Sequence, residues 1–85
     1  MWEIAYSKQS LKDLRRMPAD VAALVTTKVK AVAEDPLAPN NNVKKLTGRP
    51  GYRLRVGDWR VVYDLQKSLR VLSVERIGPR GKVYE

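Results

Sequence analysis

The chain carries two kinds of hydrophobic pattern, and the change from one to the other divides it into two parts. Before residue 36, apolar side chains recur every three or four positions, the spacing of one face of a helix. After residue 48, apolar and polar side chains alternate, the spacing of one face of a strand. The pattern predicts an α+β fold, with helices first and a largely antiparallel sheet after them.

Two helices are expected between residues 7 and 35. The short, bulky segment 2–6 precedes them and is typical of a strand. Ser7 is a suitable N-cap for the first helix, and the Asp35-Pro36 pair should end the second. Their apolar stripes predict a helical hairpin whose buried faces are Leu11, Leu14 and Met17, then Val21, Leu24, Val25, Val29 and Val32.

A connection rich in Pro and Asn, residues 36–48, leads into three strands. Gly57-Asp58 is a two-residue hairpin signal between the first and second of them. The predicted order is therefore β-α-α-β-β-β, with the helical hairpin on one face of the sheet. The strands are expected at 52–56, 59–65 and 69–76.

The Gly57-Asp58 loop also predicts which strand residues lie opposite each other. It places Arg55 opposite Arg60, and directly opposed side chains share a face of the sheet. Arg53 falls on the same face as these two, which is turned away from the helices. The face toward the helices is expected to be apolar and to consist of Tyr52, Leu54, Val56, Trp59, Val61 and Tyr63.

The register of the third strand is predicted from a three-residue turn at 66–68. Such a turn places Asp64 opposite Arg70, an opposite-charge pair. The arginine face would then also carry a small apolar patch of Val62, Leu72 and Val74.

The composition removes several kinds of chemistry. The chain has no cysteine and no histidine, which excludes disulfides, thiolate metal sites, a cysteine nucleophile and a histidine base. The carboxylates form no acid/base dyad or metal cage, and no metal or cofactor is expected. Four of them are expected to cap or solubilise the helices: Asp13, Asp20, Glu34 and Asp35.

The net charge of +8 is distributed unevenly. Residues 1–35 hold six basic and five acidic side chains, whereas residues 36–85 hold eleven basic and four acidic ones. A one-sided positive field suggests a polyanion, most often nucleic acid, although solvated surface cations give the same composition. The N-terminus does not resemble a signal peptide and no apolar run would span a membrane, so a cytoplasmic protein is expected.

Two opposed arginines repel each other, and a phosphate between them would relieve the repulsion. The alternative is that Arg53, Arg55 and Arg60 are spread apart and solvated. Tyr84, near the C-terminus, could serve as a base, because neighbouring cations lower the pKa of a phenol. The alternative for Tyr84 is an aromatic plug at the sheet edge or a frayed tail.

Several of these segments resemble the signature of RelE/ParE toxins. They are Lys45-Leu-Thr-Gly48, the run from Tyr52 to Tyr63, Asp35-Pro36, and Ile77-Gly-Pro-Arg80 followed by Val83-Tyr84. The resemblance covers almost the whole chain and implies one RelE-like toxin domain, residues 1–85. It also implies a type II toxin-antitoxin system, with a cognate antitoxin as hetero-oligomeric partner.

RelE-type members of this family cut messenger RNA on the ribosome, by attack of the 2′-hydroxyl on the adjacent phosphate and without a metal. The resemblance implies catalytic roles for Arg53, Arg55, Arg60, Arg80 and Tyr84, with Tyr84 as general base. Arg60 and Arg80 would hold the phosphate, while Arg53 and Arg55 add to the positive field. Further RNA contacts are expected from Lys44, Lys45, Arg49, Arg76 and Lys82.

Arginines stand where RelE has a pair of lysines, and arginine does not readily release a proton. Charge stabilisation is therefore the expected role of Arg53 and Arg55. Two other functions remain open: a ParE-type toxin that inhibits DNA gyrase, and a non-catalytic nucleic-acid-binding module. The antitoxin is expected to place an acidic or amphipathic segment on the Val62, Leu72 and Val74 patch or on the helical hairpin.

Overall fold

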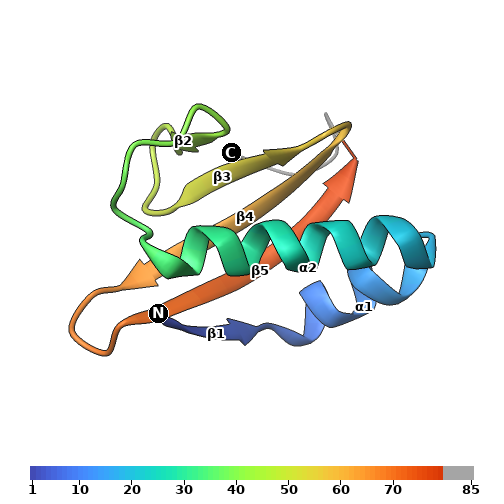
Figure 1. The fold of residues 1–85 in the computed structure, drawn as a ribbon, viewed down its shortest axis with the longest axis horizontal. Coiled ribbons are helices and arrows are strands. Elements are labelled where there is room, and N and C mark those ends of the chain that lie inside the picture. The colour runs from blue at the N-terminus through green and yellow to red at the C-terminus, as the bar shows by residue number, and fades with distance from the viewer. Residues whose placement is uncertain (80–85) are drawn as a thin grey trace.

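The computed structural model describes residues 1–79, which form a sheet covered by helices (Figure 1). All five strands belong to one sheet, in the order β1-β5-β4-β3-β2. Helix α2 crosses the face of the sheet in Figure 1, and side chains of both helices enter the same core. The elements are β1 (Glu3–Tyr6), α1 (Lys8–Arg16), α2 (Ala19–Glu34), β2 (Val43–Lys45), β3 (Tyr52–Val56), β4 (Trp59–Gln66) and β5 (Val71–Pro79).

The predicted α+β fold is confirmed, and so is the register of the central hairpin. Strand β1 pairs with β5 in parallel, and the other three pairings are antiparallel. Arg55 lies opposite Arg60, and Tyr52 opposite Tyr63, as the two-residue loop predicts. The Tyr52 and Tyr63 rings also stack, with their centroids 5.5 Å apart.

Strand β2 is an addition to the predicted order, because residues 36–48 were expected to be a connection. Its three residues pair with β3, and Lys44 lies opposite Arg53. The prolines and asparagines before this strand are typical of a loop, and three residues are too few to show an alternating pattern.

The predicted register between β4 and β5 is wrong. The turn is longer than expected, and Arg70 adopts a left-handed backbone with φ of 54°. Asp64 therefore lies opposite Ser73 rather than Arg70, and an irregularity between Val62 and Tyr63 shifts the pairing again. Arg60 comes to lie opposite Gly78.

The predicted apolar patch consequently does not exist. Leu72 and Val74 enter the main core with the helices, while Val62 packs separately with Leu46. All three residues of the expected patch are buried. An antitoxin cannot use them as an exposed docking surface.

Both helices begin and end where the sequence predicts. The Ser7 side chain accepts a hydrogen bond from the Ser10 backbone N–H at 3.0 Å, and Asp35 is the C-cap of α2. Helix α2 buries Val25, Val29 and Val32, but Leu24 at the margin of the stripe is 48% exposed. Among residues 1–79, no helix combines the length and the apolarity needed to cross a membrane.

Helix α1 differs from its prediction, because it buries polar side chains against β5. Leu11 is 42% exposed, whereas Ser10 and Asp13 are buried. Strand β1 pairs with β5 only as far as Val74, and beyond that point α1 supplies the hydrogen bonds. The Ile77 N–H donates to Asp13 Oδ2 at 2.8 Å, and Ser7 Oγ donates to the Glu75 carbonyl at 2.8 Å.

Asp13 is therefore a structural residue, not the solubilising one that was expected. Asp13→Ala leaves the Ile77 N–H without its acceptor and should lower the free energy of unfolding by about 1–3 kcal/mol, measured by urea denaturation. Asp13→Asn retains an acceptor oxygen and should recover part of the loss. The control, Asp20→Ala, removes an exposed first-turn carboxylate and should cost less than about 1 kcal/mol. Equal losses of stability at both positions would contradict the role of Asp13 as the acceptor for the Ile77 N–H.

Tyr63 carries a hydroxyl that is buried and has no hydrogen-bond partner among the described residues. Burial, and to a smaller extent the neighbouring Tyr52, raises the pKa of Tyr63. A raised folded-state pKa means that the unfolded chain loses the phenolic proton more easily. The associated stability is therefore complete below about pH 10 and is lost as the pH rises above that value.

Tyr63→Phe should be neutral or stabilising by up to about 1 kcal/mol at pH 7, because it removes an unsatisfied polar group. Above about pH 10 the variant should gain further on the wild type, since it has no phenol to ionise. Unfolding curves at pH 7 and pH 10.5 measure both effects. A variant that is less stable than the wild type at both pH values would show that the hydroxyl has a partner.

Candidate functional site

Four cationic side chains lie on the face of the sheet that is turned away from the helices. One row runs across the strands, with Lys44 opposite Arg53, Arg53 opposite Val62, and Val62 opposite Arg76. The next row places Arg55 opposite Arg60. Opposed residues share a face, so these rows form one surface. We call it the cationic face: Lys44, Arg53, Arg55 and Arg60. Arg76 is opposite Val62 in the sheet, but its side chain turns to helix α1, where Arg76 Nε lies 3.5 Å from Asp13 Oδ2.

The alternation of β3 and its short loop bring the arginines together. Arg53 and Arg55 are two residues apart on one strand and therefore point the same way. Gly57, with φ of 58°, permits the two-residue loop that returns Arg60 beside Arg55. Arg55 Nε also donates to the Gly57 carbonyl at 3.4 Å, which holds its side chain near the loop.

A hollow of about 190 Å³ opens on the cationic face. Its described lining contains no carboxylate, so an anion would meet hydrogen-bond donors on several sides. Arg53 and Arg60 are half-buried, and Arg55 is exposed. The residues that line this arginine hollow are Asn41, Asn42, Lys44, Arg53, Arg55 and Arg60.

The arginine hollow can hold an anion, but its own residues are poor proton acceptors. Guanidinium groups stay protonated and present paired donors that match phosphate oxygens. Asparagine contributes neutral donors and acceptors. Transfer of a proton would therefore need a group from outside the hollow.

Not every predicted RNA-contact residue lies beside the arginine hollow. Arg49 pairs with Glu75 at 2.7 Å, across the loop that packs Leu46 on Val62. Lys45 lies opposite Tyr52, a residue of the face toward the helices. Arg76 pairs with Asp13 of helix α1, with 3.5 Å between Arg76 Nε and Asp13 Oδ2, and only Lys44 of the described RNA-contact residues lines the arginine hollow. Three predicted site residues lie outside the described residues: Arg80, Lys82 and Tyr84.

The sequence interpretation missed Asn41 and Asn42, which form one wall of the hollow. The Asn42 carbonyl accepts a hydrogen bond from the Arg55 N–H at 2.8 Å and so ties this wall to β3. The Val43-Lys44-Lys45 run was the available signal, because β propensity at Val43 beside exposed lysines suits an edge strand.

Comparison with known proteins gives one family and a group of similar structures. Residues 4–84 match the family model described as the ParE toxin of the type II toxin-antitoxin system parDE. No curated protein matches the chain.

The intact E. coli RelBE toxin-antitoxin complex contains a similar structure, with a TM-score of 0.80 and 24% identity over 96% of this chain and 100% of that one. The RelE-RelB complex of Pyrococcus horikoshii also contains a similar structure, with a TM-score of 0.79 and 26% identity over 96% of this chain and 98% of that one. The YoeB/ParE toxin of Agrobacterium tumefaciens has a TM-score of 0.76 and 18% identity, over 92% of this chain and 98% of that one.

Proposed function

The chain belongs to the ParE toxin family of type II toxin-antitoxin systems, and from that premise we propose that it is a ribosome-dependent messenger-RNA endonuclease. The observation that carries the proposal is the arginine hollow, where three guanidinium groups and Lys44 converge without a carboxylate in the described lining. A phosphodiester is the anion that this donor set fits best. The toxin acts in the cytoplasm, on a message held by the ribosome.

The reaction is an attack of the ribose 2′-hydroxyl on the adjacent phosphate. The 2′-oxygen forms a bond to phosphorus and the bond to the 5′-oxygen breaks, which leaves a 2′,3′-cyclic phosphate. The leaving 5′-oxygen takes up a proton from water. Negative charge develops on the phosphate oxygens, and Arg60 with Arg80 stabilises it. Arg53 and Arg55 strengthen the positive field, and Tyr84 accepts the proton of the 2′-hydroxyl.

The other cations have supporting roles in this proposal. Lys44, on the cationic face, contacts a phosphate next to the one that is cut. Arg76, paired with Asp13 at the edge of the sheet, adds only to the long-range attraction of the message. Lys45, Arg49 and Lys82 contribute to the long-range attraction of the message and of ribosomal RNA. For Arg49 this requires exchange of its Glu75 partner for a phosphate. Both side chains of that pair are about 40% exposed, so the exchange meets little resistance.

The toxin is expected to be held inactive by a cognate antitoxin. The E. coli and Pyrococcus horikoshii structures are complexes of RelE with RelB, and we propose a hetero-oligomer of the same kind for this chain. An antitoxin that covers the cationic face would prevent phosphate from entering the arginine hollow.

The second candidate is inhibition of DNA gyrase, the activity that the resemblance implies for a ParE-type toxin. The family model that matches residues 4–84 is the one observation that favours it. On that reading the cationic face binds a protein or DNA and cuts nothing.

A cell-free translation extract with a defined message separates the candidates. The endonuclease proposal expects new 5′ ends within the message, only when ribosomes translate it, and undiminished supercoiling by purified gyrase. Tyr84→Phe should abolish the cuts while binding of a single-stranded RNA oligonucleotide is retained. Intact message with inhibited gyrase would overturn the proposal in favour of the second candidate. Intact message with active gyrase and retained RNA binding would leave a non-catalytic binding module.

A further inference from the structure

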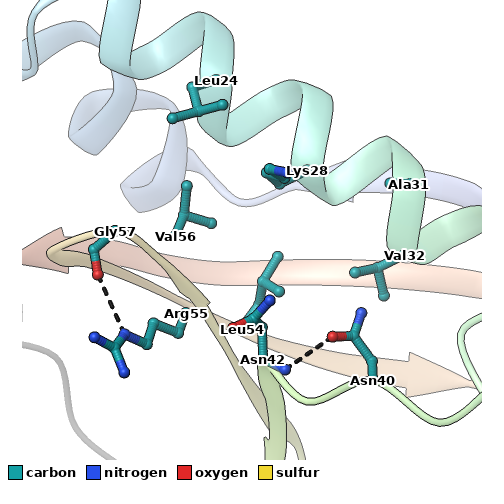
Figure 2. A pocket seen from close by; sticks show the side chains of 10 residues that line it. All are labelled: Leu24, Lys28, Ala31, Val32, Asn40, Asn42, Leu54, Arg55, Val56 and Gly57. Carbon is teal, nitrogen blue, oxygen red and sulfur yellow. Dashed lines mark hydrogen bonds between the residues drawn. The ribbon is translucent and has the colours of Figure 1, made fainter.

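Three consecutive asparagines precede strand β2, and the first of them has a structural role. Asn40 Oδ1 accepts a hydrogen bond from the Asn42 backbone N–H at 2.9 Å, the dashed line between these two residues in Figure 2. The Asn40 carbonyl accepts a second one from the Val43 N–H at 3.1 Å. Asn40 therefore holds a turn in place, and its side-chain oxygen is already used for that purpose.

The side chains of Asn41 and Asn42 are in a different situation. Both residues are exposed, and both line the arginine hollow. Within the described part of the chain, neither side-chain amide makes a hydrogen bond, since Asn42 uses only its main chain for the turn. These two amides are therefore available to a molecule that enters the hollow.

The backbone fixes Asn42 beside the arginines. The Arg55 N–H donates to the Asn42 carbonyl at 2.8 Å, which continues the pairing of β2 with β3 by one residue. Arg55 in turn lies opposite Arg60, so an asparagine and two arginines follow one another across the edge of the sheet. Because Asn42 is held by the turn on one side and by β3 on the other, little ordering of the chain is needed for it to contact a ligand.

The hydrogen-bonding chemistry of the hollow is uneven, and the two asparagines provide what the other residues lack. Lysine and arginine side chains donate hydrogen bonds and accept none. Among the described lining residues, the side-chain acceptors are therefore the amide oxygens of Asn41 and Asn42. A phosphate needs only donors. A nucleotide also presents donors of its own, and in this lining only the asparagine side chains can accept from them.

We propose that Asn41 and Asn42 recognise the base next to the phosphate bound in the hollow, by accepting a hydrogen bond from N6 of adenine or N4 of cytosine. The amide NH₂ group can at the same time donate to the ring nitrogen beside that amine, on the edge that single-stranded RNA leaves open. Guanine and uracil carry a carbonyl oxygen in place of this amine, and Lys44 or an arginine can donate to it. The inference rests on the proposal that the hollow binds a phosphodiester of the message, but not on cleavage.

The ribose 2′-hydroxyl is the other donor that a message brings. In the proposed reaction the 2′-hydroxyl beside the scissile phosphate gives its proton to Tyr84, so that donor already has an acceptor. The base has no acceptor among the described lining side chains other than the two asparagines. A contact with the 2′-hydroxyl would also distinguish RNA from DNA without distinguishing one base from another. The two possibilities therefore differ in what they predict for binding.

The test measures binding of labelled RNA octamers by the purified full-length toxin without ribosomes, by fluorescence anisotropy. Cytidine and uridine octamers have the same backbone and differ in the amine and the adjoining ring nitrogen. A variant with both Asn41→Ala and Asn42→Ala should bind the cytidine octamer about three- to tenfold more weakly, the usual effect of a lost neutral hydrogen bond. Its affinity for the uridine octamer should stay within about twofold of the wild type.

Two further variants serve as controls. Gln66→Ala removes an exposed amide of β4 that lies outside the described lining, and should leave both affinities within about twofold. Asn40→Ala removes the acceptor of the turn, and should change both affinities by the same factor. Unfolding curves establish that each variant is folded.

Equal losses on the cytidine and uridine octamers in the double variant, or no loss on either, would overturn the inference. Equal losses that are absent from the matching DNA octamers would assign the amides to the 2′-hydroxyl instead. A wild-type toxin that binds neither RNA would overturn both the inference and the phosphate site. An intact message with a loss specific to cytidine would refute cleavage alone, and a cut message with equal losses would refute base recognition alone.

Discussion

Arg60→Ala is expected to lower the rate of message cleavage on the ribosome by about 10²–10³-fold, the usual cost of removing one donor that stabilises transition-state charge. Arg60 is half-buried, lies opposite Arg55 and lines the arginine hollow. A half-buried guanidinium acts on a phosphate more strongly than an exposed one, because water screens it less. Arg60→Lys keeps the charge but loses the paired donors, and should fall between the wild type and alanine.

The rate is measured as the appearance of new message 5′ ends under single-turnover conditions, with the toxin in excess of the ribosome complexes that hold the message. Arg15→Ala is the matched control, because it removes the same charge from the exposed surface of α1 and should leave the rate unchanged within about twofold. Thermal unfolding of each variant separates lost chemistry from lost structure. Equal rates for Arg60→Ala and the wild type, with both folded, would exclude the proposed role.

The part of the site that the sequence predicts depends on one local feature. A two-residue loop fixes the register of the hairpin on either side of it, so Gly57-Asp58 was sufficient to pair Arg55 with Arg60. Nothing beyond residues 52–63 was needed. The same reasoning failed between β4 and β5, where a longer turn and an irregularity at Val62 and Tyr63 change the pairing twice. Turn length and irregularities depend on packing that the local sequence does not contain.

Asp13 shows a second limit of sequence patterns. Its place on a helix, between charged and apolar residues, gives no sign that it serves a strand 64 positions away. The need for it arises only because β1 ends before β5 does, which leaves the Ile77 N–H exposed to the helix. A buried backbone donor requires an acceptor, and here an aspartate on α1 supplies it. Such a requirement becomes visible only when the lengths and pairing of the strands in the folded sheet are known.

The corrected register between β4 and β5 also changes where an antitoxin can bind. The residues expected to form an exposed patch, Val62, Leu72 and Val74, are buried, so apolar docking must occur elsewhere. The helical hairpin is the other region predicted to receive the antitoxin, and it exposes Leu11 and Leu24, at 42% and 48%.

Gly51→Ala should be the most damaging small substitution outside the cationic face. Gly51 has φ of 116°, which L side chains rarely adopt, and an added Cβ would lie 2.9 Å from the Tyr63 carbonyl oxygen and 3.2 Å from Leu46 Cδ1. The first contact is with backbone, which cannot move aside without disturbing β4. Backbone strain and overpacking together should cost about 2–5 kcal/mol, measured by urea denaturation.

Gly48→Ala is the matched control in the same loop. Gly48 has φ of 75°, but an added Cβ would meet nothing within 4 Å, so only the backbone strain of about 1–2 kcal/mol applies. Equal losses at both glycines would show that the loop moves freely away from β4. The expected difference matters for the site, because Leu46 N–H donates to the Gly51 carbonyl at 3.0 Å and closes the hairpin that carries Lys44. A domain of this size has only about 5–10 kcal/mol of stability, so Gly51→Ala should also reduce toxicity by lowering the folded population.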